Sequence, residues 1–403
     1  MNVIAGRVSF IGMCAAVLAL VGCGGGGGGG TTVQPILNTQ PVVVDLGPAG
    51  YINVLFTSLT ICAPGNANSC QTIDHIQVDT GSSGLRILAS VLAPALRSLP
   101  AQTDDAGNPI VECMQFVDGF SWGPIKRADL RIAGESADSV PIQIIGDPAY
   151  SSIPADCSST GPPENTVDDF GANGIIGIGF FLQDCGSACA SSAAYGLYYR
   201  CPTASTCQPT TVPVAKQVQN PGALFGIDNN GAIIDLPAVP PIGAATVGGS
   251  LIFGIGTQSN NGLGNATTLP VDANTGNFVT VYAGRSYRNS FFDSGSGATY
   301  FGTGEFPACR GTASGLYCPA TLQTLSATLR GDTGAARTIT FDVANGEAVL
   351  SANPTFAAFG NVASPNSDPT SFDWGLPFFY GRRIYTAYEG RSTPAGPGPY
   401  LAF

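Results

Sequence analysis

Short apolar runs separated by glycine, proline, serine and asparagine dominate this chain, a pattern that favours strands over helices. Residues 42–45 and 51–56 have the apolar runs and alternation expected of strands, the second of them half-buried. A Pro-Gly-Asn-rich segment between Cys62 and Cys70 predicts a hairpin, and residues 74–78 predict a strand that ends at Asp79. Because Val, Ile, Thr, Phe and Tyr fill most runs, we expect an all-β fold.

Two apolar runs end in the same polar motif: Val78-Asp79-Thr80-Gly81-Ser82-Ser83-Gly84 and Phe292-Asp293-Ser294-Gly295-Ser296-Gly297. One such turn is ordinary turn chemistry. Two copies indicate two similar halves that each contribute one carboxylate. We therefore expect Asp79 and Asp293 to meet between two β-rich lobes as an acid–base pair, the alternative being two unrelated Asx-type turns.

Length and charge limit the possible functions. A chain of 403 residues exceeds the size at which one core usually keeps growing, which favours two lobes or domains. The formal net charge of −11 argues against nucleic acid as a partner, because phosphate binding needs a concentrated basic surface.

The first residues have the features of a targeting segment. Arg7 precedes an apolar run over residues 8–21, and Leu20-Val21-Gly22-Cys23 resembles the lipobox of bacterial lipoproteins. We expect residues 1–22 to be a signal peptide and Cys23 to be lipidated, with residues 23–40 as a glycine-rich tether. This places the protein in the bacterial cell envelope, anchored by lipid and facing the periplasm or the cell surface. A secretory signal with a chance cysteine is the alternative.

Cysteine usage fits an oxidising compartment. Of the 12 cysteines, Cys14 would leave with the signal and Cys23 would carry lipid, which leaves an even number. Short separations favour the pairs Cys62–Cys70, Cys185–Cys189, Cys201–Cys207 and Cys309–Cys318, with Cys113 left for Cys157, although other pairings within 185–207 stay open. We expect no metal site and no cofactor, because the chain has a single histidine, His75, and no paired Cys-x-x-Cys spacing.

The segment Val78–Ile87 resembles the first active-site motif of the pepsin-like aspartic peptidases, and further landmarks of that family follow in order. Residues 116–123 and the strand ending at Ile132 resemble the flap hairpin, and residues 173–180 resemble the apolar-Gly segment behind the first aspartate. Residues 249–254 resemble the start of the second lobe. Residues 374–379 resemble that lobe's apolar-Gly segment, after the second motif at Asp293. The chain also resembles a bacterial group of pepsin-like lipoproteins that has no assigned function.

The resemblance implies two pseudo-symmetric β-barrel lobes, over residues 41–245 and 246–403, with an active-site cleft between them. Asp79 and Asp293 would be catalytic. Thr80 and Ser294 would hydrogen-bond across the lobes, Ser82 and Ser296 would support the carboxylates, and Gly81 and Gly295 would allow close approach of the two turns. The flap and cleft residues would be Phe116, Gly119, Trp122 and Arg86.

Two positions depart from the family. Phe116 stands where the family usually has a tyrosine, and Arg86 stands where it often has a tryptophan. A substituted pair, with Arg86 stacked on Phe116, is one interpretation. It would put a cation beside the carboxylates and lower their pKa values. Altered specificity and a cleft that no longer cuts are the others.

The favoured function is a membrane-tethered aspartic endopeptidase acting on peptides or proteins as a monomer. The alternative is a catalytically silent pepsin-like surface lipoprotein that binds a protein or glycan; a purely structural surface protein would leave the two matched motifs unexplained. A Ser-His-Asp hydrolase would need His75, which lies on the strand leading to Asp79 and is more simply a surface or hydrogen-bonded core histidine.

Overall fold

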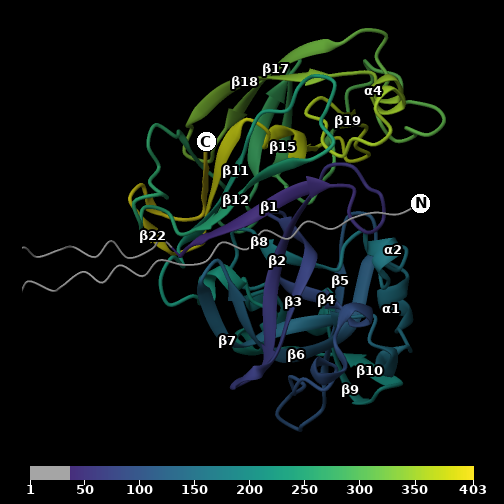
Figure 1. The fold of residues 1–403 in the computed structure, drawn as a ribbon, viewed down its shortest axis with the longest axis vertical. Helices are drawn as coiled ribbons and strands as arrows, with labels where there is room; N and C mark the ends of the chain where they lie inside the picture. Colours follow the sequence, from purple (N-terminus) through teal and green to yellow (C-terminus); the bar gives the residue numbers. More distant parts are fainter. Residues whose placement is uncertain (1–36) are drawn as a thin grey trace, which may run out of the picture. The chain divides into compact units, whose positions relative to one another are not determined.

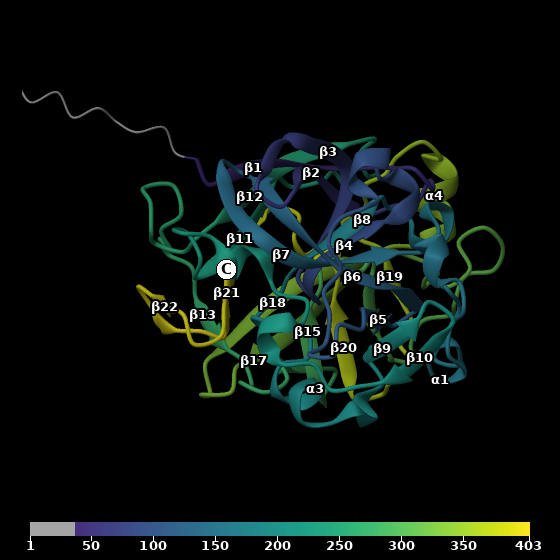
Figure 2. The ribbon, with the colours of Figure 1, turned by 90° about the horizontal axis from the view of Figure 1, so that it is seen from below.

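Strands make up most of the structure, a computed structural model that describes residues 37–403 (Figure 1). The all-β prediction is therefore confirmed. The helices in these residues are short: α1 (Ala155–Ser158), α2 (Val167–Phe170), α3 (Ser187–Ser191) and α4 (Gly346–Ala352). Figure 2 shows α1, α3 and α4 around the outside of the strands.

The larger sheet contains fifteen strands. In spatial order they are β10 (Thr206–Pro209), β9 (Tyr198–Thr203), β5 (Ile110–Gln115), β6 (Phe120–Ile132), β7 (Glu135–Ile145), β4 (Ser83–Leu88), β8 (Gly174–Ile178), β3 (Asn66–Asp79), β2 (Val54–Ala63), β1 (Thr39–Asp45), β12 (Val247–Phe253), β11 (Gly231–Leu236), β21 (Arg382–Ala387), β24 (Tyr400–Ala402) and β13 (Thr268–Pro270). An extra pairing of β6 with β2 curls the first part of this sheet back on itself.

The second sheet contains seven strands. Their order is β18 (Ala336–Val343), β17 (Gln323–Arg330), β14 (Phe278–Tyr282), β15 (Arg285–Phe292), β20 (Ser371–Trp374), β16 (Thr299–Phe301) and β19 (Ala363–Ser364). A separate small ribbon joins β22 (Ser392–Thr393) to β23 (Gly396–Pro397).

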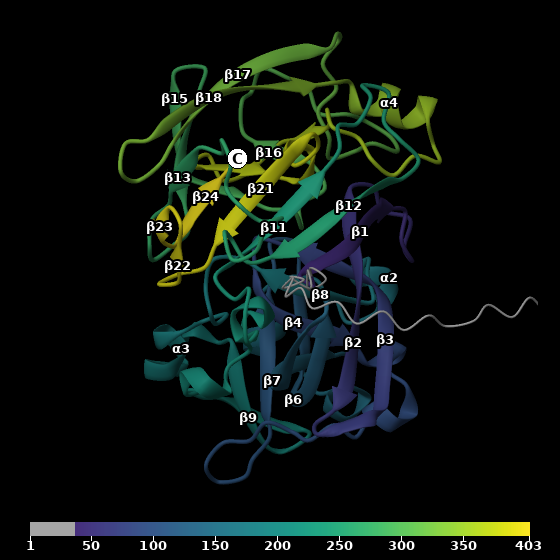
Figure 3. The same cartoon turned by 60° about the vertical axis from the view of Figure 1, so that its left-hand side comes forward.

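Strand β1 connects the two halves of the larger sheet, because it pairs with β2 on one side and with β12 on the other. In Figure 3, β2, β3 and β6 lie below β1, whereas β11, β21 and the second sheet lie above it. Residues 249–253, from the segment that resembles the start of the second lobe, lie in β12.

The same three-strand arrangement occurs twice. Strand β3 pairs in parallel with β8, and β4 pairs with the same β8 in the antiparallel sense. In the second sheet, β15 pairs in parallel with β20, and β16 pairs with β20 in the antiparallel sense. The turns β3–β4 and β15–β16 hold the two Asp motifs, so each motif leaves a strand that is fixed by a parallel neighbour.

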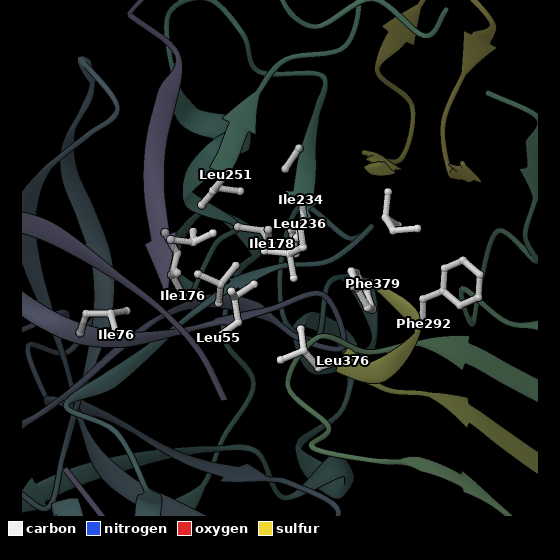
Figure 4. Close-up of a cluster of buried hydrophobic side chains, with 14 of the residues drawn as sticks. Leu55, Ile76, Ile176, Ile178, Ile234, Leu236, Leu251, Phe292, Leu376 and Phe379 are labelled. Atoms are coloured by element: carbon white, nitrogen blue, oxygen red, sulfur yellow. The ribbon is translucent and has the colours of Figure 1, made fainter. Parts of the chain in front are cut away.

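A continuous apolar core joins the strands of both sheets. Figure 4 shows Ile176 and Ile178 of β8 in the same region as Phe292 of β15, with Leu376 and Phe379 from the segment after β20. All of these side chains are buried. The strand ends that carry the two Asp motifs therefore rest on one shared core.

All five expected disulfides are present: Cys62–Cys70, Cys113–Cys157, Cys185–Cys189, Cys201–Cys207 and Cys309–Cys318. The first closes the predicted hairpin between β2 and β3, where Cys62 and Cys70 are directly opposed. The second joins β5 to α1.

Some expected boundaries move. Strand β1 begins at Thr39, so Thr39 and Gln40 are sheet residues and not part of the tether. Strand β2 begins at Val54 and not at Tyr51. The expected signal peptide, Cys23 and the glycine run lie outside the described residues. Among residues 37–403, no helix is both long and apolar enough to cross a membrane.

Candidate active site

Asp79 is the last residue of β3, and Asp293 directly follows β15. The opposing residue on the parallel strand is Gly177 for Asp79, and the register of β15 with β20 ends at the pair Phe292–Trp374. The backbone N–H of Asp293 donates to the carbonyl of Trp374 at 3.1 Å. Each aspartate is therefore held at a strand end by the apolar-Gly segment expected to lie behind it.

The two carboxyl groups lie against each other's glycine turn. A Cβ atom added to Gly81 would lie 2.8 Å from Asp293 Cγ, and one added to Gly295 would lie 2.8 Å from Asp79 Oδ1. Both distances are too short for real contacts, so only glycine fits at either position. The structure thus brings the two predicted aspartates together across two glycine turns.

Thr80 and Ser294 connect the two turns through four hydrogen bonds. The backbone N–H of Thr80 donates to Ser294 Oγ at 3.1 Å, and the backbone N–H of Ser294 donates to Thr80 Oγ1 at 3.0 Å. The Thr80 hydroxyl also donates to the carbonyl of Phe292, and the Ser294 hydroxyl donates to the carbonyl of Val78. Both side chains are buried, which makes this two-fold exchange the closest link between the motifs.

Each carboxyl also has two local donors. The N–H of Gly81 donates to Asp79 Oδ1 at 2.6 Å, and the N–H of Gly295 donates to Asp293 Oδ1 at 2.7 Å. The Ser82 hydroxyl donates to Asp79 Oδ2, and the Ser296 hydroxyl lies 2.9 Å from Asp293 Oδ2. The predicted supporting residues are therefore all in contact with the carboxylates.

A third carboxyl, which the sequence interpretation missed, belongs to the same cluster. Asp373 in β20 is buried, and its Oδ2 lies 2.6 Å from Ser296 Oγ. The signal in the sequence is an acidic residue between Phe372 and Trp374, inside an apolar run. Burial raises the pKa of Asp373 well above its ordinary value, although the hydrogen bond from Ser296 acts in the opposite direction.

The electrostatics of the site favour protonation of Asp293. Burial raises its pKa well above the ordinary value, and the nearby carboxylates of Asp79 and Asp373 raise it further. Tyr300 on β16 opposes Asp373 in the register with β20. Burial raises its pKa to about 12, with contributions from the carboxylates of Asp373, Asp118 and Asp293. Sequence reasoning did not identify Tyr300.

The hairpin β5–β6 is present where the flap is expected, with residues 116–119 as its turn. The N–H of Phe116 donates to the carbonyl of Gly119 at 2.8 Å, and the neighbouring Val117 is almost fully exposed. Gly119 fits closely against the loop at 162–164, because an added Cβ would lie 2.6 Å from the carbonyl oxygen of Pro162. The Phe116 ring packs edge-on against Phe170 of α2, with 5.8 Å between centroids.

Trp122 was expected in the flap and cleft, but its side chain is buried beneath the hairpin. Its ring packs edge-on against Tyr199 of β9, and its Nε1 donates to the carbonyl of Tyr150 at 2.8 Å. Trp122 belongs to a separate buried cluster with Cys113, Cys157, Tyr199 and Cys201, which explains its burial. Trp122 is thus a core residue.

Arg86 does not stack on Phe116, and that expectation is wrong. Its guanidinium is fully buried, where it donates to both carboxylate oxygens of Glu112, at 3.1 and 2.8 Å, and to Asp184 at 3.1 Å. Tyr198 completes the cluster by donating to Asp184 at 2.8 Å. The guanidinium is instead paired with Glu112 and Asp184. For Asp293 the expected lowering of the pKa by Arg86 is also wrong, because burial and the carboxylates of Asp79 and Asp373 raise it.

His75 is the residue that a Ser-His-Asp hydrolase would need. It lies within 3.4 Å of Asp45 and 3.3 Å of Asp74, and its ring packs edge-on against Phe56. Within residues 37–403, no group of three or more His, Cys, Asp or Glu side chains is arranged to hold a metal ion.

Comparison with known proteins adds a family but no activity. No curated protein sequence matches the chain. One family model matches residues 34–403, which is nearly the whole chain, and the description of that family is a protein of unknown function. The chain therefore belongs to the DUF3443 family.

Proposed function

We propose that this protein is a pepsin-like aspartic endopeptidase that hydrolyses peptide bonds with a water molecule activated by Asp79 and Asp293. The observation that carries the proposal is the mutual approach of the two carboxyl groups, each against the other's glycine. Two unrelated Asx turns would have no reason to exclude a Cβ at both Gly81 and Gly295, or to share the Thr80–Ser294 exchange.

The chemistry follows from the proximity of two acids. Adjacent carboxylates cannot both ionise cheaply, so they share a proton and titrate as a unit. The ionised partner takes a proton from a bound water, which attacks the scissile carbonyl carbon, while the protonated partner donates to the carbonyl oxygen. The raised pKa of Asp293 favours its role as the proton donor. No covalent intermediate is required.

The repeated three-strand arrangement supports a bilobal organisation of this enzyme. We propose that residues 41–245 and 246–403 form two pseudo-symmetric lobes, with Asp79 and Asp293 at the base of the cleft between them. The units β3–β4–β8 and β15–β16–β20 would be the equivalent parts of the two lobes. The hairpin β5–β6 would cover the cleft as its flap.

We also propose that the enzyme acts in the cell envelope, attached through lipid on Cys23. Five disulfides support an oxidising compartment outside the cytoplasm. The substrate would then be a peptide or protein that reaches the membrane surface.

A second candidate is a binding protein that no longer cuts. The observation that favours it is Phe116, which carries no hydroxyl at the position where pepsin-like peptidases usually have the flap tyrosine. A peptide or glycan would then bind over the carboxyl pair without being hydrolysed.

Digestion of a peptide library tests both candidates. Wild type should cleave, whereas Asp79→Asn and Asp293→Asn should not, with unchanged near-ultraviolet circular dichroism in all three. The matched control is Asp105→Asn, which alters an exposed ion pair with Lys216 and should leave cleavage intact. Cleavage that persists in both site variants would refute the mechanism. A wild type that binds a pepstatin-type inhibitor but cuts nothing would favour the binding protein.

A further inference from the structure

Three side-chain oxygens lie in a row beside the carboxyl pair. Ser296 Oγ is 2.6 Å from Asp373 Oδ2 and 2.9 Å from Asp293 Oδ2. Both distances are those of hydrogen bonds. A serine hydroxyl has one hydrogen to donate, and an ionised carboxylate has none. Because two hydrogen bonds need two hydrogens, one of the two carboxyl groups must carry a proton.

Asp373 is better placed than Asp293 to carry the hydrogen of the Ser296 contact, because the proton on Asp293 is shared with Asp79. Its side chain is buried, and its Oδ1 has no hydrogen-bond partner within residues 37–403. Asp293, in contrast, accepts from the N–H of Gly295. A buried ionised carboxylate with an unpartnered oxygen is costly, whereas the neutral acid requires fewer donors.

Within residues 37–403, Asp373 lies near other acids and forms no ion pair with a cation. Asp293 follows the neighbouring strand β15, Asp79 ends β3, and Tyr300 opposes Asp373 on β16. In the described chain, no lysine, arginine or histidine donates a hydrogen bond or forms an ion pair with Asp373. Burial among acids also raises its pKa, which agrees with the proton count.

We propose that Asp373 is a protonated third carboxyl of the site, which donates to Ser296 Oγ and so directs the Ser296 hydroxyl onto Asp293 Oδ2. Asp373 is a positioning residue, since it reaches Asp293 only through Ser296. When Asp373 ionises, the Ser296 hydroxyl turns to it instead. Asp293 then loses a donor and gains a nearby negative charge. The effect on catalysis rests on the proposed peptidase function, but the location of the proton does not.

Carboxyl-carbon nuclear magnetic resonance of the full chain, labelled with ¹³C-carboxyl aspartate, tests the proton directly. The resonance that is missing in Asp373→Asn identifies Asp373 in the wild-type spectrum. We expect that resonance to keep its protonated shift at pH values where exposed aspartates have already ionised. Titration of Asp373 at the ordinary aspartate value of about 4 would overturn the proposal. This outcome is independent of whether the protein cuts peptides.

Kinetics then test the route through Ser296. Asp373→Leu should lower kcat about tenfold with little change in KM, as for the loss of one hydrogen bond to Asp293. Asp373→Asn keeps a donor and should lose clearly less. Adding Asp373→Leu to Ser296→Ala should cause no further loss, because neutral Asp373 acts on Asp293 through the Ser296 hydroxyl. A further loss of kcat in the double variant would contradict the route from Asp373 through Ser296 to Asp293. Equal losses for Asp373→Asn and Asp373→Leu would also contradict it.

If Asp373→Leu prevents folding, the pH–rate profile of Asp373→Asn tests the same proposal. The alkaline limit of the pH–rate profile should move when the ionisable group at position 373 is removed. An unmoved limit would count against the role of Asp373.

Discussion

Thr80 and Ser294 each donate a backbone N–H to the other's side-chain hydroxyl, at 3.1 and 3.0 Å. The residues lie more than two hundred positions apart, yet the exchange is reciprocal. It fixes the separation of the two turns, and with it the approach of Asp79 to Asp293. The carboxyl pair is thus positioned by hydroxyl groups that are not themselves acids or bases.

The first prediction concerns that exchange. Thr80→Val keeps the shape of the side chain but leaves the N–H of Ser294 and the carbonyl of Phe292 without their partners. Because these groups are buried, we expect the free energy of unfolding to fall by about 1–3 kcal/mol, measured by urea titration. Thr72→Val is the control, since Thr72 bonds only the Thr60 hydroxyl on the exposed face of β3 and should change stability by less than about 0.5 kcal/mol. Equal effects at the two positions would refute the argument.

The second prediction concerns the buried cation. Arg86→Met removes the only positive charge that contacts Glu112 and Asp184 in the described residues. Burial alone would lower the pKa of Arg86, but the two carboxylates outweigh burial and raise it, so the guanidinium stays charged. We expect a loss of about 3–5 kcal/mol in the free energy of unfolding.

Lys216→Met provides the comparison for Arg86. Lys216 pairs with Asp105, whose side chain is 94% exposed, and such a pair contributes at most about 1 kcal/mol. A loss for Arg86→Met no larger than that for Lys216→Met would show that the buried cluster does not stabilise the fold.

The third prediction concerns pH. Burial and the neighbouring Asp118 raise the pKa of Glu164 from 4.5 to about 8. Between these values the folded protein holds a proton that the unfolded chain releases, so this group's contribution to stability falls as pH rises from about 4.5 to about 8. Glu164→Gln should therefore make the dependence of unfolding free energy on pH shallower in that window.

The control for Glu164 is Glu347→Gln in α4. Hydrogen bonds from Ala313 and Thr312 lower the pKa of Glu347, so it is ionised in both states above pH 5. Its replacement should shift stability by the same amount at every pH from above about 5 to about 8. A pH slope unchanged by Glu164→Gln would contradict the raised pKa of Glu164.

The sequence was most informative where a structural requirement is local. Disulfides that close short loops, the strand ending at Asp79 and the glycines beside each aspartate could all be predicted from short segments. The Arg86 cluster could not, because Glu112 and Asp184 are distant in sequence and nothing local marks them as its partners. Asp373 was missed for a related reason: an isolated acid in a strand is usually exposed, and only the pairing of β15 with β20 brings it to Ser296.

The most direct test of the carboxyl pair is a double-mutant cycle on the best peptide from the library. We expect Asp79→Asn and Asp293→Asn each to lower kcat/KM by at least about a thousandfold, and the double variant to be no slower than either single one, because the two groups act as one unit. Losses that multiply in the double variant, or a single variant that keeps most of its activity, would contradict a shared role for Asp79 and Asp293.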